Sequence, residues 1–217
     1  THLDHDACII HDPQPLPLIR FYKKRQPWIW RCHIDLTDPN QRLWNFLKSF
    51  ILKYDLVIIS NEKYLRKDLP VRQIVIPPAI DPLSPKNKPL TEYTIQKTMK
   101  KFRVPLNKPI ITQISRFDKW KDPEGVIDIY REVRKVFDCR LILCGSMASD
   151  DPEGYKIYSK ILKKHTDLIK KRDLILLTTE NSILVNALQR QANVVIQKST
   201  REGFGLTVTE ALWKGKP

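Results

Sequence analysis

Two glutamates flank a glycine-bearing turn near the end of the chain, and their spacing could serve ligand binding. Glu202 and Glu210 enclose a segment that begins Gly203-Phe204-Gly205-Leu206. Glycines let the backbone approach a ligand closely, and the first N–H groups of a following helix attract anions such as phosphate. A carboxylate one turn into that helix can accept hydrogen bonds from a vicinal diol. Acids near a helix start are also common on ordinary surface helices, so the spacing alone leaves both interpretations open.

A second pattern pairs an arginine with a lysine directly after a predicted strand. Arg116 follows the strand expected at Pro109 to Ser115, and Lys121 comes five residues later. A guanidinium pairs with phosphate oxygens as a fork, and an ammonium adds a point charge. Seen alone, such a pair is more often a solvated surface feature. Its place at the carboxyl end of a strand, where open α/β sheets bind ligands, raises the weight of a phosphate site, and both interpretations stay open.

Polar residues also follow strands in the first third of the chain. His11 ends the strand expected at Ala7 to His11, and Arg31, His33 and Asp35 alternate at the end of the next one. Arg31, His33 and Asp35 could line a ligand site at the strand ends, or equally form an ordinary polar strand face. A single histidine such as His11 is more often a polar core or loop residue than a site residue.

A further strand end near the middle of the second half could lie beside a nucleotide base. Leu177 and Thr178, followed by Thr179, end the strand expected from Leu174. The alternative is a plain strand end followed by a helix cap near Asn181.

Short aliphatic runs alternate with amphipathic stretches along the whole chain, and this alternation predicts an α/β fold with parallel sheets. The expected strands are Ala7 to His11, Ile29 to His33, Leu56 to Ser60, Ile74 to Pro77, Pro109 to Ser115, Arg140 to Gly145, Leu174 to Thr178 and Val194 to Lys198. The expected helices are Gln41 to Lys53, Thr91 to Phe102, Pro123 to Phe137, Tyr155 to Lys171, Ser182 to Gln191 and Thr207 to Trp213.

A proline-rich stretch from Pro77 to Pro85 separates two such series, and its four prolines cannot join a central strand or continue a helix. We therefore expect one α/β domain over residues 1–77, a connection over 78–90 and a second α/β domain over 91–217. A buried-type strand follows Thr1 closely and no strand follows the last helix, so we expect the first domain to be incomplete and the second to be truncated.

The glutamate pattern and the arginine–lysine clamp together resemble the Glu-x7-Glu family of retaining glycosyltransferases. The resemblance implies the GT-B arrangement, in which two Rossmann-like domains face a cleft. It implies that residues 1–77 are part of the acceptor-side domain and that residues 91–217 form the nucleotide-sugar-binding domain. It implies that Glu202 contacts the donor sugar, that residues 203–206 approach the sugar and diphosphate, and that Glu210 holds the ribose. It also implies that Arg116 and Lys121 grip the diphosphate and stabilise the leaving group, and that His11 lies near the donor sugar.

The segments Arg31-Cys32-His33-Ile34-Asp35 and His11-Asp12-Pro13-Gln14 resemble a subgroup, the trehalose synthases of the glycosyltransferring type. This resemblance implies transfer of glucose from a nucleoside diphosphate glucose to glucose, with retention and front-side attack. The family's amino-terminal glycine-rich loop is absent from this sequence. The alternatives are another acceptor such as a sugar phosphate, a nucleotide-binding fragment without activity, or a basic nucleic-acid-binding module.

The composition is that of a globular protein with a strongly basic balance. The 38 basic and 24 acidic residues give a net charge of +14, but no stacking motif accompanies it, so we expect no nucleic-acid partner. No apolar run approaches a bilayer span and no secretory signal precedes the first strand, so we expect no membrane partner and a cytoplasmic location. A homodimer is left open, and abundant Lys, Arg and Ile with two Met suggest adaptation to heat.

The four cysteines lack the spacing of a disulfide framework or a zinc site, and we expect Cys8, Cys32, Cys139 and Cys144 to be buried thiols. The family resemblance implies no obligatory metal and no cofactor beyond the nucleotide-sugar donor and the sugar acceptor. Mg²⁺ is left open.

Overall fold

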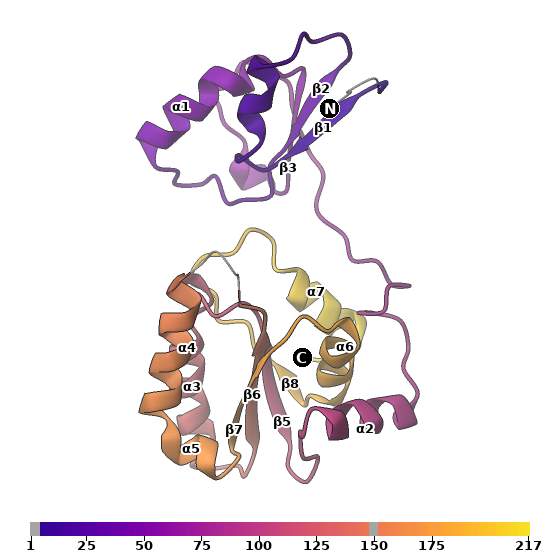
Figure 1. Ribbon diagram of the computed structural model, residues 1–217, viewed down its shortest axis with the longest axis vertical. Helices are drawn as coiled ribbons and strands as arrows, with labels where there is room; N and C mark the ends of the chain where they lie inside the picture. Colours follow the sequence, from indigo (N-terminus) through magenta and orange to yellow (C-terminus); the bar gives the residue numbers. More distant parts are fainter. Residues whose placement is uncertain (1–4, 148–151) are drawn as a thin grey trace. The chain divides into compact units, whose positions relative to one another are not determined.

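The computed structural model describes residues 5–147 and 152–217, and the chain divides into two compact units (Figure 1). The first unit comprises Thr1–Ala79 together with Glu202–Phe204, and the second comprises Ile80–Arg201 and Gly205–Pro217. Each contains a four-stranded sheet in which every pairing is parallel. The expected α/β class with parallel sheets is confirmed.

The first unit is a sheet in sequential order β1-β2-β3-β4 with a long helix and two short 3-10 helices. Its elements are β1 Cys8–His11, η1 Leu16–Arg20, β2 Trp28–Arg31, α1 Gln41–Ile51, β3 Leu56–Ile59, η2 Glu62–Tyr64 and β4 Gln73–Val75.

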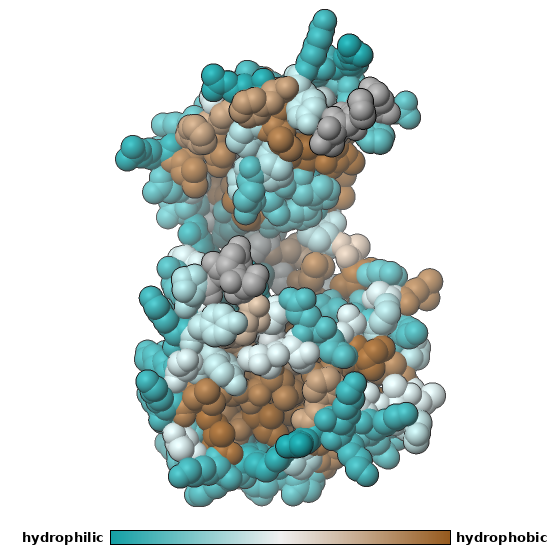
Figure 2. Space-filling view, viewed as in Figure 1, coloured by the Kyte–Doolittle hydropathy of each residue, from teal (hydrophilic) through white to brown (hydrophobic). Residues whose placement is uncertain are grey.

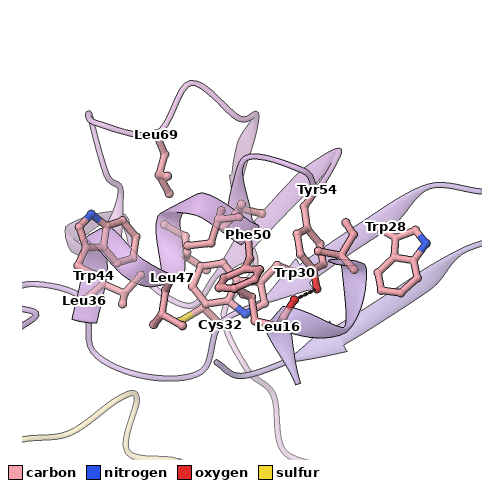
Figure 3. Packing of buried hydrophobic residues seen from close by; sticks show 14 of the residues in the cluster. Leu16, Trp28, Trp30, Cys32, Leu36, Trp44, Leu47, Phe50, Tyr54 and Leu69 are labelled. Atoms are coloured by element: carbon pink, nitrogen blue, oxygen red, sulfur yellow. Dashed lines mark hydrogen bonds between the residues drawn. The ribbon is translucent and has the colours of Figure 1, made fainter. Parts of the chain in front are cut away.

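Large aromatic side chains fill the core of this unit (Figure 3). Trp28 and Trp30 of β2 and Trp44 of α1 are almost fully buried, and the Tyr54 hydroxyl donates to the Leu16 carbonyl over 2.9 Å. Helix α1 begins where Asn40 accepts a hydrogen bond from the Leu43 amide, as an N-cap residue does. The packed core holds the carboxyl ends of β1 and β2, which carry the two predicted histidines.

The second unit has the strand order β7-β6-β5-β8, with the first strand of the unit at the centre of the sheet. Its elements are α2 Glu92–Lys101, β5 Ile110–Ile114, η3 Lys119–Lys121, α3 Pro123–Val133, β6 Arg140–Gly145, α4 Pro152–Lys164, α5 Thr166–Lys170, β7 Leu174–Thr178, α6 Ser182–Gln191, β8 Val194–Val195 and α7 Leu206–Trp213.

Helices cover both faces of this sheet, as the right-handed crossover of parallel strands requires. Helices α3, α4 and α5 lie on one face, and α2, α6 and α7 lie on the other (Figure 1). Each face has its own apolar cluster, centred on Ile127 and Leu141 on one side and on Met99 and Leu188 on the other. Because both faces are buried, the strand sequences are continuously aliphatic rather than alternating.

Several predicted elements have other bounds than expected: the helix expected at Pro123 to Phe137, for example, ends at Val133. Two further differences have a visible tertiary cause. The single helix expected over Tyr155 to Lys171 is interrupted at His165, whose imidazole is buried and whose φ of −117° leaves the helical range. The strand expected over Val194 to Lys198 ends at Val195. Beyond it, the chain turns so that Lys198 forms an ion pair with Asp122 at the start of α3.

The surface is mainly hydrophilic, with apolar patches on both units in the face that Figure 2 shows. Among the described residues, no helix is long and apolar enough to cross a membrane. All four cysteines are free and buried, as predicted. Burial raises the pKa of both the Cys32 and Cys144 thiols to about 12, which keeps them protonated at neutral pH.

Candidate functional site

The loop that follows β5 holds the predicted arginine and lysine around one buried aspartate. Oδ1 of Asp118 accepts hydrogen bonds from the amides of Trp120 and Lys121, at 2.9 and 3.0 Å. Oδ2 of the same carboxylate lies 3.6 Å from the Arg116 guanidinium, which is exposed. From within the strand, Gln113 donates to the Lys121 carbonyl over 2.7 Å. Asp118 thus joins Arg116 and Lys121 in one ordered turn at the carboxyl edge of the second sheet.

The helix start that the glycines were predicted to form lies beside this turn. Gly205 has a φ of +85°, a conformation that favours glycine, and it is the N-cap residue of α7. From the second residue of α7, the Thr207 hydroxyl donates to the Ile114 carbonyl at the end of β5 over 3.3 Å. The amino end of α7 and the carboxyl end of β5 therefore meet, which places partial positive charge next to the loop of Arg116 and Lys121.

Glu210 is a buried acid in a polar setting. Its side chain is only 5% exposed, and Oε1 lies 2.7 Å from the Lys86 ammonium. The amide of Gln189 on α6 donates to Oε2 over 3.4 Å. A carboxylate this deeply buried is retained only when its charge is paired and hydrogen-bonded, and both conditions are met here.

The two predicted base-side residues point in different directions. Leu177 packs into the apolar cluster on the α2 and α6 face, whereas Thr178 lines a pocket of about 480 Å³. Neighbouring side chains of a strand point to opposite faces, which explains the separation. The pocket lies at the ends of β6 and β7 against α4, and its lining residues are Ser146, Met147, Tyr155, Tyr158, Ser159, Leu162, Thr178, Thr179 and Glu180.

In the first unit, His11 and His33 lie against each other at the ends of β1 and β2. Their rings stack with centroids 5.1 Å apart, and His11 Nδ1 lies 2.8 Å from His33 Nε2. The Asp12 carboxylate accepts a hydrogen bond from the His33 amide over 3.1 Å, and Asp12 has a φ of +66°. Burial lowers the pKa of His33, with Arg31 and His11 acting in the same direction and Asp12 opposing them.

The other two acceptor-side residues have partners within the first unit. The buried Arg31 guanidinium donates to the carbonyls of Ile59 and Ile76, at 3.2 and 2.7 Å. The Asp35 carboxylate accepts from the amide and hydroxyl of Thr37. Arg31 thus holds the carboxyl ends of β3 and β4 together. A role of Arg31 or Asp35 toward an acceptor stays a prediction.

Glu202, Gly203 and Phe204 belong to the first unit, whereas Gly205, Leu206 and Glu210 belong to the second. The predicted donor contacts of the first three residues stay a prediction. Sequence reasoning assigned no role to Asp118 or Lys86, although both occupy the site region of the second unit. An aspartate four residues after a strand end is a signal for a side-chain-capped turn, but nothing in the sequence around Lys86 points to Glu210.

Comparison with known families identifies the chain. The model of the trehalose synthase N-terminal domain matches residues 1–66, and the model of glycosyl transferases group 1 matches residues 94–217, more than half of the chain. The chain therefore belongs to the glycosyl transferases group 1 family, and the predicted enzyme class, glycosyltransferase, is confirmed at the level of the family.

Among curated proteins, the trehalose synthase of Thermococcus litoralis is 53% identical over 214 residues, covering 98% of this chain and 52% of that protein. The chain spans about half the length of the curated relatives it matches first. The expectation of adaptation to heat agrees with these relatives from thermophilic archaea.

Solved structures with low sequence identity share the fold. An E. coli structure bound with UDP-2-fluoro glucose superimposes with a TM-score of 0.76 at 17% identity, covering 98% of this chain and 56% of that one. The sucrose-phosphate synthase of Thermosynechococcus elongatus gives a TM-score of 0.72 at 17% identity, with 98% and 55% coverage.

Proposed function

We propose that this chain is part of a retaining glycosyltransferase that moves glucose from a nucleoside diphosphate glucose to glucose and so forms α,α-trehalose. The observation that carries the proposal is the ordered turn of Arg116, Asp118 and Lys121 beside the amino end of α7. Glucose as the acceptor is supported by the match of residues 1–66 to the trehalose synthase N-terminal domain and by the 53% identity to a trehalose synthase.

In this proposal the second unit binds the donor. The Arg116 guanidinium and the Lys121 ammonium hold the diphosphate oxygens, and the helix start at Gly205 and Leu206 adds amide donors. Glu210 accepts hydrogen bonds from the ribose hydroxyls, and Thr178 lies in the pocket toward which the base extends. A fold neighbour whose structure contains UDP-2-fluoro glucose supports a nucleotide-sugar as the donor.

The same cations assist the reaction. The bond between the anomeric carbon and the diphosphate breaks while negative charge grows on the leaving oxygen, and fixed positive charges stabilise that charge in the transition state. The acceptor hydroxyl attacks from the face that the diphosphate leaves, and the leaving phosphate takes its proton. His11, Glu202 and the first-unit residues Arg31, His33 and Asp35 contribute the sugar side of the site in this proposal.

The test is calorimetric binding of UDP, ADP and GDP to this chain and to its Arg116→Ala and Lys121→Ala variants. We expect each variant to bind the preferred diphosphate about tenfold or more weakly, because each loses a charge-assisted hydrogen bond to phosphate. Lys119→Ala is the matched control, since Lys119 belongs to the same loop and pairs with Trp120 and Glu153 instead. Unchanged affinity in both site variants would remove them from the site.

A second candidate keeps the donor and changes the acceptor to a sugar phosphate. It is favoured by the fold likeness to a sucrose-phosphate synthase. Incubation of the complete natural protein with the preferred donor and a panel of glucose, glucose 6-phosphate and fructose 6-phosphate separates the two. Trehalose from glucose supports the first candidate, and a phosphorylated disaccharide supports the second.

A further inference from the structure

A buried polar network fixes the segment that leads into the second unit. Asn87 is 2% exposed, and its side chain donates to the Asp81 carbonyl over 3.0 Å and accepts from the Lys214 ammonium over 2.8 Å. The main-chain carbonyl of Asn87 accepts a hydrogen bond from the Arg190 guanidinium over 3.0 Å. The donors and acceptors of this buried amide are therefore used to hold a loop against α6 and α7.

Helix α6 fixes the same segment on either side of Lys86. The buried Asn186 amide donates to the carbonyls of Pro85 and Lys88, at 2.9 and 2.8 Å, and Arg190 also donates to Lys88 over 3.2 Å. Because the backbone is held on both sides, the position of the Lys86 Cα atom is set by α6. Because the backbone is already ordered, formation of the ion pair costs Lys86 only the conformational entropy of its side chain.

The Lys86 ammonium reaches one oxygen of the Glu210 carboxylate, 2.7 Å away, and is itself 37% exposed. The other oxygen accepts a hydrogen bond from the side-chain amide nitrogen of Gln189. The side-chain oxygen of Gln189 in turn accepts one from the Lys214 ammonium over 2.7 Å. Lys214 also donates to the main-chain oxygen of Glu210 over 3.2 Å. The carboxylate is thus held from two sides, by a partly solvated cation and by a buried amide.

The second lysine of the network cannot replace the first. Burial lowers the pKa of Lys214 to about 8, with Arg190 and Lys86 acting in the same direction and Glu210 opposing them. The Lys214 ammonium donates to the side chains of Asn87 and Gln189 and to the main-chain oxygen of Glu210, and Lys86 contacts the carboxylate itself. Lys86 is therefore the cation that pairs with the carboxylate of Glu210.

We propose that Lys86 is a positioning residue for ribose recognition: it orients the Glu210 carboxylate so that the remaining lone pairs of its oxygens accept hydrogen bonds from the two ribose hydroxyls. This inference rests on the proposed function, in which Glu210 contacts the ribose. It makes residues 81–88, near the start of the second unit, part of the donor site's supporting structure.

The test compares the preferred nucleoside diphosphate with its 2′,3′-dideoxy counterpart, which keeps the base and diphosphate but lacks the diol. In the wild-type chain the diol should tighten binding measured by calorimetry. Lys86→Met and Glu210→Gln should each remove about tenfold or more of that preference while leaving the affinity for the dideoxy compound unchanged. The double variant should lose no more than either single variant, because the two residues act as one unit.

Lys86→Arg, which keeps the cation, should restore most of the preference, and Lys100→Met on the exposed face of α2 is the matched control. In the wild-type chain, the NMR signal of the Lys86 ammonium should also shift with the nucleotide but not with its dideoxy counterpart. If Glu210→Gln loses the preference for the diol and Lys86→Met keeps all of it, the inference is wrong. An absence of nucleotide binding by the wild-type chain overturns the proposed function instead.

Discussion

His11 and His33 lie ring to ring in the first unit, so a charge on His11 acts on the protonation of His33. Burial, aided by Arg31 and His11, lowers the pKa of His33 below its ordinary value of 6.5. We predict that an NMR titration of the ring protons places the midpoint of His33 below 6.5. His11→Asn should raise that midpoint, because it removes a neighbouring positive charge, and Asp12→Asn should lower it further, because it removes a carboxylate.

The sign of the linked stability follows from the same shift. Between the lowered pKa and 6.5 the folded chain binds fewer protons at His33 than the unfolded chain, so the free energy of unfolding falls as the pH decreases through this window. Urea unfolding between pH 7 and 5 should show a smaller decrease in His33→Asn than in the wild-type chain. An equal or larger decrease in the variant would contradict the prediction, and His5→Asn, at an exposed position, is the control.

At the residue scale, motif spacing predicted which side chains could serve the chemistry but not what holds them. The sequence placed Arg116 and Lys121 in one loop, because five residues separate them after a strand. It could not place Asp118 between them, because an aspartate in a loop has many alternative partners. It also gave no sign of the pair between Lys86 and Glu210, which lie 124 positions apart (210 minus 86) and meet only through tertiary packing.

At the scale of elements, the carboxyl ends of β5 and β6 approach so closely that only glycine fits between them. A Cβ atom on Gly145 would lie 1.7 Å from the Ser115 carbonyl oxygen, which is main chain and cannot rotate away. We predict that Gly145→Ala forces the two strand ends apart, lowers the free energy of unfolding by about 1–3 kcal/mol or more, and weakens diphosphate binding at the neighbouring Arg116.

Chemical denaturation and calorimetry measure the two effects. Gly154→Ala is the control, because a Cβ atom there comes no closer than 3.1 Å to the Phe117 carbonyl oxygen. A Gly145→Ala variant with wild-type stability and affinity would show that the strand ends are not a fixed support of the site.

Strand and helix patterns predicted most elements because buried parallel strands read as short aliphatic runs. The exceptions have local causes. The helical periodicity continues from α4 into α5, and only the tertiary burial of His165 shows where the first helix ends. Strand β8 ends early because Lys198 turns toward Asp122, a partner 76 positions away that no local pattern reveals.

At the scale of the whole molecule, the chain has two units with separate cores, and each predicted role belongs to one of them. The phosphate and ribose contacts of the proposal, Arg116, Lys121 and Glu210, lie in the second unit. His11 and Glu202, which are predicted to contact the donor sugar, lie in the first. A nucleoside diphosphate without its sugar therefore offers contacts chiefly to the second unit.

This division predicts a one-sided stabilisation. A diphosphate at about 100 times its dissociation constant stabilises the state that binds it by about 2.7 kcal/mol. Among the residues that the structure describes, the two units share no apolar cluster. We therefore expect hydrogen exchange to slow in β5, β6 and β7 when the diphosphate is added, while exchange in β1, β2 and β3 stays unchanged. Arg116→Ala should abolish the effect at the same ligand concentration. Equal slowing in both sheets would mean that the diphosphate site is shared by the two units, and the assignment of phosphate binding to the second unit alone would be wrong.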